Sequence, residues 1–515
     1  MKFLLLREHS EIKGNISHGL GLIGTIAKEV ATVKIIDNNS FYKTYSIKQL
    51  IEKIRLFEPD VIGFHIHTYN VHITRLLITE VRLIFPHICL IGGGLHAYYR
   101  PAEILEIGIH ICAKEEADLT IIPLLRALQL ANENPTDNFY VTPVLADKLK
   151  LISGLIFNQE GSKEYIDTGR PEFIKNLDEL PFIDHDLFNL EDFILSPVDA
   201  NHVSNTLLTQ RGCPFSCSFC QGPDNSAYMM VREASPEYKI RYIEYLIEKH
   251  GHDRVNFYDA NFTLNRKKAI AFCDLMIESG LNTKIKFTCS TNVAGKIDQQ
   301  FAAKIEEAGC VVLSLGVERL DPESLQKIGK NKKFHLVMDN IKIWSKTNIQ
   351  VDVNAMIGFP FETVETIKKE ESSFAEILDL VDSIMAYIVI PIPGTKIYEE
   401  TDKQRWYMQE PYASWDPPFY HTVYNHEGDA WKRNYFNLDK KTMRAILSMK
   451  ERMYGRIIQK VNSPLLSFLF LLLQILAKIS LAIFTVSPRL EKILFFPVRA
   501  VYTFLWKNMA EKYYN

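Results

Sequence analysis

Residues 206–220 read Thr206-Leu-Leu-Thr-Gln-Arg-Gly-Cys213-Pro-Phe-Ser-Cys217-Ser-Phe-Cys220. The first four residues favour a β-strand, and a loop with three cysteines follows within a few residues. The cysteine spacing is C-x3-C-x2-C, so the three thiolates can face one centre if the loop wraps around it. Thiolates are soft ligands that select iron–sulfur clusters, zinc or copper(I). The stretch therefore predicts a strand with a metal-binding loop at its end.

Three interpretations of these cysteines remain open at this point. Structural zinc usually takes four Cys or His ligands, and no further cysteine follows until Cys273. A [4Fe–4S] cluster also normally takes four ligands, so three cysteines would leave one iron open for a non-protein ligand. The third interpretation is a loop whose cysteines share no role. The other five cysteines are expected to be small buried residues: Cys89, Cys112, Cys273, Cys289 and Cys310.

The three-cysteine loop follows the first of six strand-like runs that alternate with helical patterns. The clearest helix begins at Ser235-Pro-Glu237, with serine as N-cap and proline at the first helical position, and it ends at Gly251. Six strand–helix units are too few for a closed eight-fold barrel and predict an open, partial barrel with its active site at the strand C-termini. The runs are Thr206–Thr209, Val255–Asp259, Lys286–Thr291, Val311–Gly316, Val351–Ile357 and Ile384–Ile390; the remaining helices are Arg266–Ser279, Asp298–Ala308 and Phe334–Thr347.

A different α/β unit is predicted for residues 1–131. Short apolar runs such as Phe3–Leu6 and Asp60–Phe64 alternate there with helical patterns, which predicts a doubly wound, Rossmann-like parallel sheet. Ligands of such sheets lie at the carboxyl ends of the strands, where His65–Asn70 and Gly92–His96 stand. Residues 132–204 are interpreted as a connecting segment with some structure of its own, including a strand near 152–157.

The overall composition sets limits on the class of protein. A length of 515 residues corresponds to about three domains. The chain is 47% hydrophobic and 23% charged, which argues against a disordered chain or a small disulfide scaffold. A net charge of −3 gives no electrostatic case for nucleic acid. The apolar run Phe3–Leu6 is too short for a signal peptide, so a cytoplasmic protein is expected.

The last part of the chain differs from the rest. Residues 463–515 contain six Lys or Arg against two acids, within a sequence dominated by Leu, Phe and Ile. A membrane span, a helix pair lying at the membrane interface and a buried helical cap on the barrel are all compatible with this pattern. Interfacial association with the inner face of the membrane is the favoured interpretation. Residues 401–462 are expected to form a helical, aromatic-rich region.

The loop sequence resembles the signature of the radical S-adenosylmethionine superfamily, C-x3-C-x2-aromatic-C, with Phe219 at the aromatic position. The resemblance implies that Cys213, Cys217 and Cys220 bind three irons of a [4Fe–4S] cluster and that S-adenosylmethionine chelates the fourth. One electron from the cluster, delivered by a donor such as flavodoxin or ferredoxin, then cleaves S-adenosylmethionine to a 5′-deoxyadenosyl radical. The protein orients the reactants and excludes water.

Other strand ends are similar to family segments that contact S-adenosylmethionine. They are Asp259 and Asn261 after the second barrel strand, Glu318 at the end of the fourth and Gly358 after the fifth. A buried, capping role explains Asp259 equally well at this stage, and Glu318 is also compatible with a plain surface charge.

In this setting the N-terminal unit resembles a cobalamin-binding domain. The resemblance implies cobalamin contacts from two segments, whose residues are His65, Thr68, Gly92, Gly93, Gly94 and His96. The D-x-H-x-x-G motif that supplies a histidine to cobalt in some cobalamin proteins does not occur, which predicts cobalamin without a protein histidine below cobalt. Residues 113–117, Ala-Lys-Glu-Glu-Ala, also depart from the Gly-Glu-Gly-Glu of relatives.

The combined resemblance implies methyl transfer from methylcobalamin to an unactivated carbon, or to phosphorus, of a small-molecule substrate. Cobalamin-dependent cyclisation or rearrangement, on a lipid or another apolar substrate, is the first alternative. A non-catalytic cobalamin or iron–sulfur sensor is the alternative from another class.

Overall fold

The computed structural model describes residues 1–9, 16–40, 43–130, 138–162, 164–193, 206–221, 229–293, 295–330 and 334–399, with scattered positions between 436 and 498. The predicted aromatic region 401–462 and the apolar tail 463–515 therefore lie almost entirely outside the described residues. Of their described positions, Ile446 and Met449 are buried against the main core. Within the described ranges no helix is long and apolar enough to cross a membrane.

The N-terminal unit is built on a seven-stranded sheet with the order β2-β1-β3-β4-β5-β6-β7. The first five strands are parallel and follow the 2-1-3-4-5 order of one doubly wound class, in which the winding direction reverses between β1 and β3. The strands are β1 (Lys2–Arg7), β2 (Thr32–Asp37), β3 (Val61–His65), β4 (Cys89–Gly93), β5 (Ile111–Ala113), β6 (Leu155–Asn158) and β7 (Tyr165–Asp167).

The sheet extends beyond residue 131. Strands β6 and β7 belong to the segment expected to connect the domains. Strand β6 pairs antiparallel with β5, and β7 pairs antiparallel with β6. The strand expected near 152–157 is thus present as β6, but it completes the N-terminal sheet.

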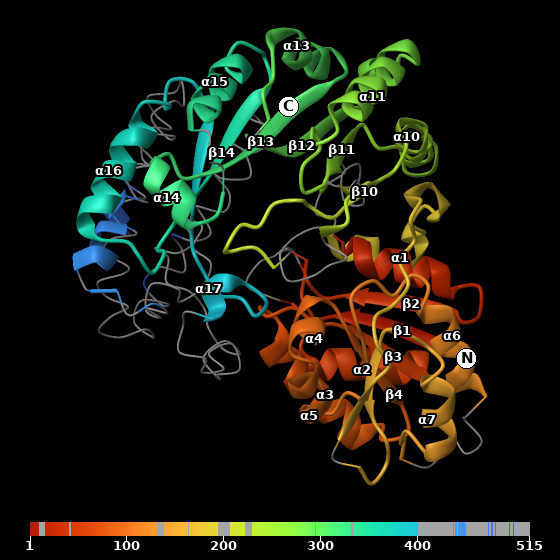
Figure 1. Ribbon diagram of the computed structural model, residues 1–515. Helices are drawn as coiled ribbons and strands as arrows, with labels where there is room; N and C mark the ends of the chain where they lie inside the picture. Colours follow the sequence, from red (N-terminus) through yellow and green to blue (C-terminus); the bar gives the residue numbers. More distant parts are fainter. Residues whose placement is uncertain are drawn as a thin grey trace.

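Helices cover both faces of this sheet (Figure 1). Because helices exclude water from both sides, the central strands are apolar throughout, as in Phe3–Leu6 of β1, whose four side chains are all buried. The helices are α1 (His18–Ala27), α2 (Ile47–Phe57), α3 (Val71–Ile84), α4 (Leu95–Tyr99), α5 (Pro101–Glu106), α6 (Ile121–Gln129) and α7 (Pro143–Leu149).

The second unit is a curved sheet of six parallel strands in the order β15-β14-β13-β12-β11-β8. All six strands predicted from the sequence are present, and the partial (β/α)6 barrel is confirmed. Its strands are β8 (Thr206–Leu207), β11 (Arg254–Phe257), β12 (Lys286–Asn292), β13 (Cys310–Glu318), β14 (Gln350–Ile357) and β15 (Ser383–Ile388). A short antiparallel pair flanks the cysteine loop in the chain: β9 (Gln210–Arg211) precedes the loop and β10 (Arg232–Glu233) follows it.

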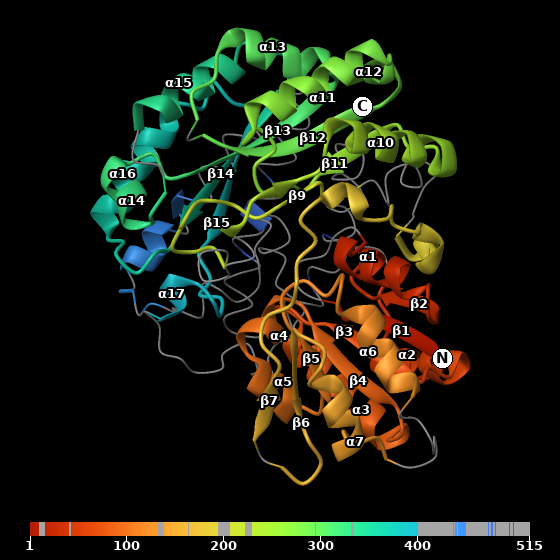
Figure 2. The same ribbon diagram turned by 45° about the vertical axis from the view of Figure 1, so that its right-hand side comes forward.

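The barrel helices form an arc on the outer side of the strands (Figure 2). Helix α10 begins and ends as predicted: the Ser235 side chain accepts a hydrogen bond from the Tyr238 amide, and Gly251 ends the helix with a left-handed φ of 67°. The helices are α10 (Pro236–His250), α11 (Arg266–Glu278), α12 (Leu281–Lys284), α13 (Gln299–Glu307), α14 (Pro322–Lys327), α15 (Phe334–Trp344), α16 (Val364–Ala375) and α17 (Lys396–Glu399).

The connecting segment binds the two units to each other. Phe182 stacks on Tyr242 of α10 with ring centroids 4.5 Å apart, and the Ile183 amide donates to the Tyr242 hydroxyl at 3.0 Å. Three short 3-10 turns lie in or near this segment, at Leu177–Glu179, His185–Leu187 and Leu190–Phe193. One buried apolar cluster consequently runs from β1 through the connecting segment into the barrel.

Candidate functional site

The cysteine loop starts directly after β9 and is held by backbone contacts from distant segments. The Ser218 amide donates to the Ile328 carbonyl at 2.9 Å, and the Ile397 amide donates to the Ser218 carbonyl at 3.1 Å. Gly329 has a φ of +66°, and a Cβ there would lie 2.9 Å from the Ser216 carbonyl oxygen. Only glycine permits this close approach, so the loop after α14 presses on the cysteine loop from one side.

The three thiols of the loop converge. Burial raises the pKa of Cys217 to about 11; Lys330 lowers it, and the charges of Cys220 and Cys213 raise it. Burial also raises the pKa of Cys213, where Cys220 contributes again. The thiols of Cys213 and Cys217 are therefore protonated at neutral pH without metal, and a metal would displace these protons. Among the described residues no three such ligands meet closely enough for a single ion; in an iron–sulfur cluster each cysteine binds a different iron.

Lys330 is the residue of this site that the sequence did not single out. Its Nζ lies 2.8 Å from Oε1 of Glu318 and 5.8 Å from the centre of the Phe219 ring. Glu318, the last residue of β13, is buried and has an unusual φ of 66°. The pair is next to the cysteines, because the charges of Lys330 and Glu318 both affect the pKa of Cys217. In the sequence Lys330 is marked only by its place after Gly329 at the end of a helix. That pattern is too common to indicate a site.

Asp259 ties two strand ends together. Its carboxylate accepts hydrogen bonds from the Thr209 amide and hydroxyl, both at 2.6 Å, and from the Gln210 amide at 2.7 Å. It thereby fixes the chain between β8 and the cysteine loop, which agrees with the alternative of a buried structural role. Asn261 accepts from the Thr291 hydroxyl at 2.8 Å and is 5% exposed.

Gly358 follows β14 with a φ of +92°, and its amide donates to Oε2 of Glu362 at 2.6 Å. Glu362 and Glu370 both pair with Arg319, and all three side chains are fully buried. Burial raises the pKa of Glu362 to about 7, although Arg319 acts to lower it. The cost of burying the charged carboxylate outweighs the attraction of Arg319, and the nearby negative charge of Glu370 adds to the increase.

A cavity of about 500 Å³ opens at the carboxyl end of the N-terminal sheet, beside the β1/β3 reversal. From this sheet its lining includes His65, Gly93 and Gly94. From the barrel side it includes Arg211 and Gly212, the residues immediately before Cys213. The cavity is therefore shared by both units and borders the cysteine loop.

The cobalamin residues expected from the sequence divide into two groups. Gly94, in the cavity wall, has a φ of +98°, and a Cβ there would lie 2.8 Å from the Ile66 carbonyl oxygen. Thr68, His96 and Gly92 are not part of the cavity lining. Thr68 and His96 instead form a buried hydrogen bond of 3.0 Å, and the other ring nitrogen of His96 lies 3.3 Å from Glu103.

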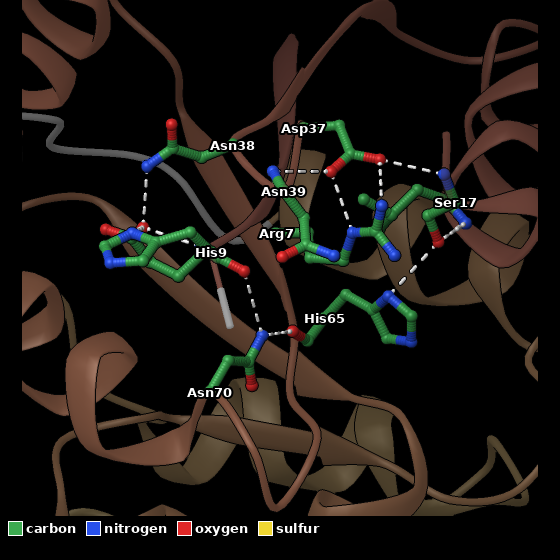
Figure 3. Close-up of polar contacts among 10 residues, drawn as sticks. Arg7, His9, Ser17, Asp37, Asn38, Asn39, His65 and Asn70 are labelled. Atoms are coloured by element: carbon green, nitrogen blue, oxygen red, sulfur yellow. Dashed lines mark hydrogen bonds and ion pairs between the residues drawn. The ribbon is translucent and has the colours of Figure 1, made fainter. Parts of the chain in front are cut away.

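His65 is held by a chain of polar contacts (Figure 3). Its Nδ1 lies 3.2 Å from Oγ of Ser17, whose amide donates to Asp37 at 2.8 Å. Arg7 in turn binds both oxygens of Asp37 at 2.7 and 2.8 Å. Burial lowers the pKa of His65 well below its usual value, with smaller contributions from His67 and Arg7, so the ring is neutral at pH 7.

The loop after β5, which includes residues 114–117, forms buried ion pairs with the barrel unit. Arg211 binds Glu116 at 2.6 Å and Asp118 at 2.5 Å, and Arg232 binds Glu116 at 3.0 Å. Arg211 and Asp118 are nearly buried, with side chains 10% and 5% exposed. This ion cluster joins the loop after β5 to β9 and β10, the two short strands on either side of the cysteine loop.

Comparison with known families assigns both units. Residues 207–370 match the Radical SAM superfamily, and residues 18–122 match the B12 binding domain. The chain is therefore a cobalamin-binding-domain-containing radical S-adenosylmethionine enzyme. Its cofactors are a [4Fe–4S] cluster, S-adenosylmethionine and cobalamin. The three-thiol loop and the glycine-lined cavity fit the cluster and the corrin ligand, respectively.

Individual proteins of known sequence or structure are also similar to this chain. An uncharacterized methyltransferase of Pyrococcus horikoshii is 29% identical over 74% of this chain and 77% of its own length. The anaerobic magnesium-protoporphyrin IX monomethyl ester cyclase of Cereibacter sphaeroides is 25% identical over 70% of this chain, but the match spans only 56% of the cyclase. The structure of the radical S-adenosylmethionine methyltransferase TsrM from Kitasatospora setae, with cobalamin and [4Fe–4S] cluster bound, superimposes with a TM-score of 0.62, covers 78% of each chain and shares 18% identity.

The ion cluster around Arg211 predicts a stability effect. Arg211→Met removes the buried cation that pairs with Asp118 and Glu116, although Glu116 keeps its second partner, Arg232. The loss should lower the free energy of unfolding by about 3 kcal/mol. Urea unfolding measures this loss. The exposed pair of Arg126 and Glu29 is the control, because Arg126→Met should change the free energy by less than about 1 kcal/mol. Equal stability of Arg211→Met and the wild type would contradict the prediction.

The raised pKa of Glu362 implies that the stability of the protein depends on pH. The pKa of Glu362 is raised from 4.5 to about 7, so between these values the folded chain holds a proton that the unfolded chain has lost. Its contribution to stability is therefore fully present below pH 4.5 and decreases as the pH rises to 7. The Glu362→Gln variant lacks this titration. Unfolding free energies measured across this range should show the wild type losing stability relative to the variant, whereas a constant difference would refute the raised pKa.

Proposed function

We propose that the protein is a methyltransferase that transfers a methyl group to an unactivated carbon, or to phosphorus, of a small molecule. The shared cavity carries this proposal. Its lining includes the carboxyl end of the cobalamin-type sheet and the two residues before Cys213, so the two proposed cofactor-binding regions border the same cavity. Methyl transfer between two cofactors requires such a space, because the reacting groups must meet without water.

The proposed roles in the barrel follow from these contacts. Cys213, Cys217 and Cys220 hold the cluster, and the buried Lys330–Glu318 pair beside them binds the charged methionyl end of S-adenosylmethionine. When bound, the cluster and S-adenosylmethionine supply a 5′-deoxyadenosyl radical, and cobalamin supplies the methyl group.

Four further barrel residues have proposed roles around these groups. Phe219 packs edge-on against Phe359 at 6.1 Å and shields one side of the cysteine loop. Gly358 lets the backbone after β14 approach the adenosine closely. Asp259 and Asn261 position the strand ends.

In the N-terminal unit, Gly93 and Gly94 are proposed to let the backbone approach the corrin. Gly92 gives close packing, since a Cβ there would lie 3.1 Å from Ile104. The buried Thr68–His96–Glu103 chain is proposed to fix the loops after β3 and β4, on which the cobalamin contacts depend.

Product analysis tests the proposal. Anaerobically reconstituted protein with a reductant, S-adenosylmethionine and substrate should release both 5′-deoxyadenosine and S-adenosylhomocysteine. A cyclase or rearrangement enzyme, the alternative favoured by the similarity to the Cereibacter cyclase, should release the first product alone. Neither product, with cluster and substrate present, would refute an enzymatic role and favour a sensor.

Cys217→Ala should abolish cleavage of S-adenosylmethionine, because the cluster loses a ligand. The matched control is Cys273→Ala, which removes a fully buried cysteine of α11 outside the loop. Iron content and 5′-deoxyadenosine release are the measurements. Cleavage retained in Cys217→Ala, or lost equally in both variants, would contradict the ligand assignment.

We also propose that a small electron donor such as flavodoxin or ferredoxin serves the protein in the cytoplasm, with no nucleic-acid partner, and that residues 463–515 attach it to the inner face of the membrane. The basic, apolar composition of this segment supports attachment. Fractionated cells should contain the protein in the membrane pellet, from which carbonate, but not buffer alone, releases it. Full recovery in the first supernatant would refute attachment.

A further inference from the structure

The cysteine loop is attached to the N-terminal unit at both of its ends. Before the first cysteine, Arg211 forms the ion cluster with the loop after β5. After the last cysteine, Cys220, the carbonyl of Gln221 accepts a hydrogen bond from the hydroxyl of Tyr99. Tyr99 is the last residue of α4, and α4 begins directly after Gly94 of the cavity wall. One contact therefore connects the chain that leaves the cysteines to the segment proposed to approach the corrin.

The loop after β15 completes this contact. Gly394 has a φ of +86°, and a Cβ at this position would overlap the ring of Tyr99. Glycine is therefore required for the two segments to come so close. The side-chain amide of Gln221 donates to the Pro393 carbonyl at 2.8 Å. The residue after the cysteines is consequently held by α4 and by the loop after β15 together.

The short helix α17 connects these contacts to two hydrophobic cores. Ile397 is buried in the cluster against which Phe219 packs, and its amide donates to the Ser218 carbonyl of the cysteine loop. The next residue, Tyr398, is buried in a different cluster, whose other buried members all belong to the N-terminal unit. Figure 1 and Figure 2 show α17 on the side of the barrel that faces α4. The contact of Tyr99 is therefore made next to a helix that is anchored in both units.

We propose that Tyr99 is a positioning residue that sets the distance and orientation between S-adenosylmethionine bound in the barrel and the corrin. The inference rests on the proposed methyl transfer and concerns the step in which S-adenosylmethionine methylates cobalamin. In this step the electron pair of cobalt(I) forms the bond to the methyl carbon. The pair of the methyl–sulfur bond stays on sulfur, which gives S-adenosylhomocysteine. Tyr99 acts through the chain that carries Cys220.

Two reactions of the same protein separate this role from a general loss of stability. Reductive cleavage of S-adenosylmethionine to 5′-deoxyadenosine uses the barrel alone, whereas methylation of cob(I)alamin requires both units in register. Full-length protein with cluster and cobalamin is reduced with titanium(III) citrate and given S-adenosylmethionine without substrate. Tyr99→Phe removes only the hydroxyl and should misalign the reacting groups. Release of S-adenosylhomocysteine should fall about tenfold and release of 5′-deoxyadenosine by less than about twofold.

A second variant and a control assign the effect to this contact. Gly394→Ala, whose new methyl group would press on the Tyr99 ring, should give the same selective loss. The matched control is Tyr238→Phe, because the Tyr238 hydroxyl also donates to a backbone carbonyl, that of Leu180 at 3.1 Å, but joins α10 to the connecting segment. Tyr238→Phe should leave the ratio of the two rates unchanged. Equal loss of both rates in Tyr99→Phe, or a ratio at the wild-type value, would overturn the proposal.

Amide hydrogen exchange of the full-length protein without cofactors gives a second readout. Loss of one hydrogen bond should loosen the chain after Cys220, so peptides that contain Gln221 or Ile397 should exchange about fivefold faster in Tyr99→Phe, and peptides of α10 should not change. Unchanged exchange at Gln221 and Ile397 would show that the contact does not fix the loop. A wild type that releases 5′-deoxyadenosine but no S-adenosylhomocysteine would refute the proposed methyl transfer, whereas an unchanged ratio in Tyr99→Phe would refute only this inference.

Discussion

The buried attraction between Arg211 and the carboxylates of Glu116 and Asp118 is the interaction on which the arrangement of this protein depends. Arg211 lies two residues before Cys213, and the carboxylates lie in the loop after β5 of the other unit. A charge removed from water requires a partner of opposite sign. The cysteine loop and the N-terminal sheet are consequently held with their ligand-binding edges toward a common cavity.

Parallel strands explain why the candidate site residues gather at this place. Every strand of the barrel, and every strand of the parallel part of the N-terminal sheet, delivers its loop at the carboxyl end. Cys213, Glu318 and Gly358 leave three different barrel strands or their extensions, whereas His65 and Gly94 leave two strands of the sheet. The strands themselves are apolar and buried, so they supply a rigid base and little chemistry.

The sequence predicted which loops form the candidate site, but not which side chains contact one another there. Lys330 was missed because a lysine after a helix is ordinary until the chain brings it 2.8 Å from Glu318. Ser17 and Asp37 were missed because their contacts with each other and with His65 join three separate strand ends. The boundary at residue 131 did not anticipate β6 and β7, since antiparallel pairing to β5 is a long-range event with only a weak local pattern.

The sequence by itself determined the chemistry and the two fold classes. The spacing of three cysteines and the alternation of apolar strands with helices are local properties, and each is written in consecutive residues. Only the tertiary structure decided which side chains share a cavity, that Glu116 pairs with Arg211, and that Ser17 holds one ring nitrogen of His65. These depend on contacts between residues about 50 to 120 positions apart, whose energy arises from burial and charge pairing, and no local pattern records them.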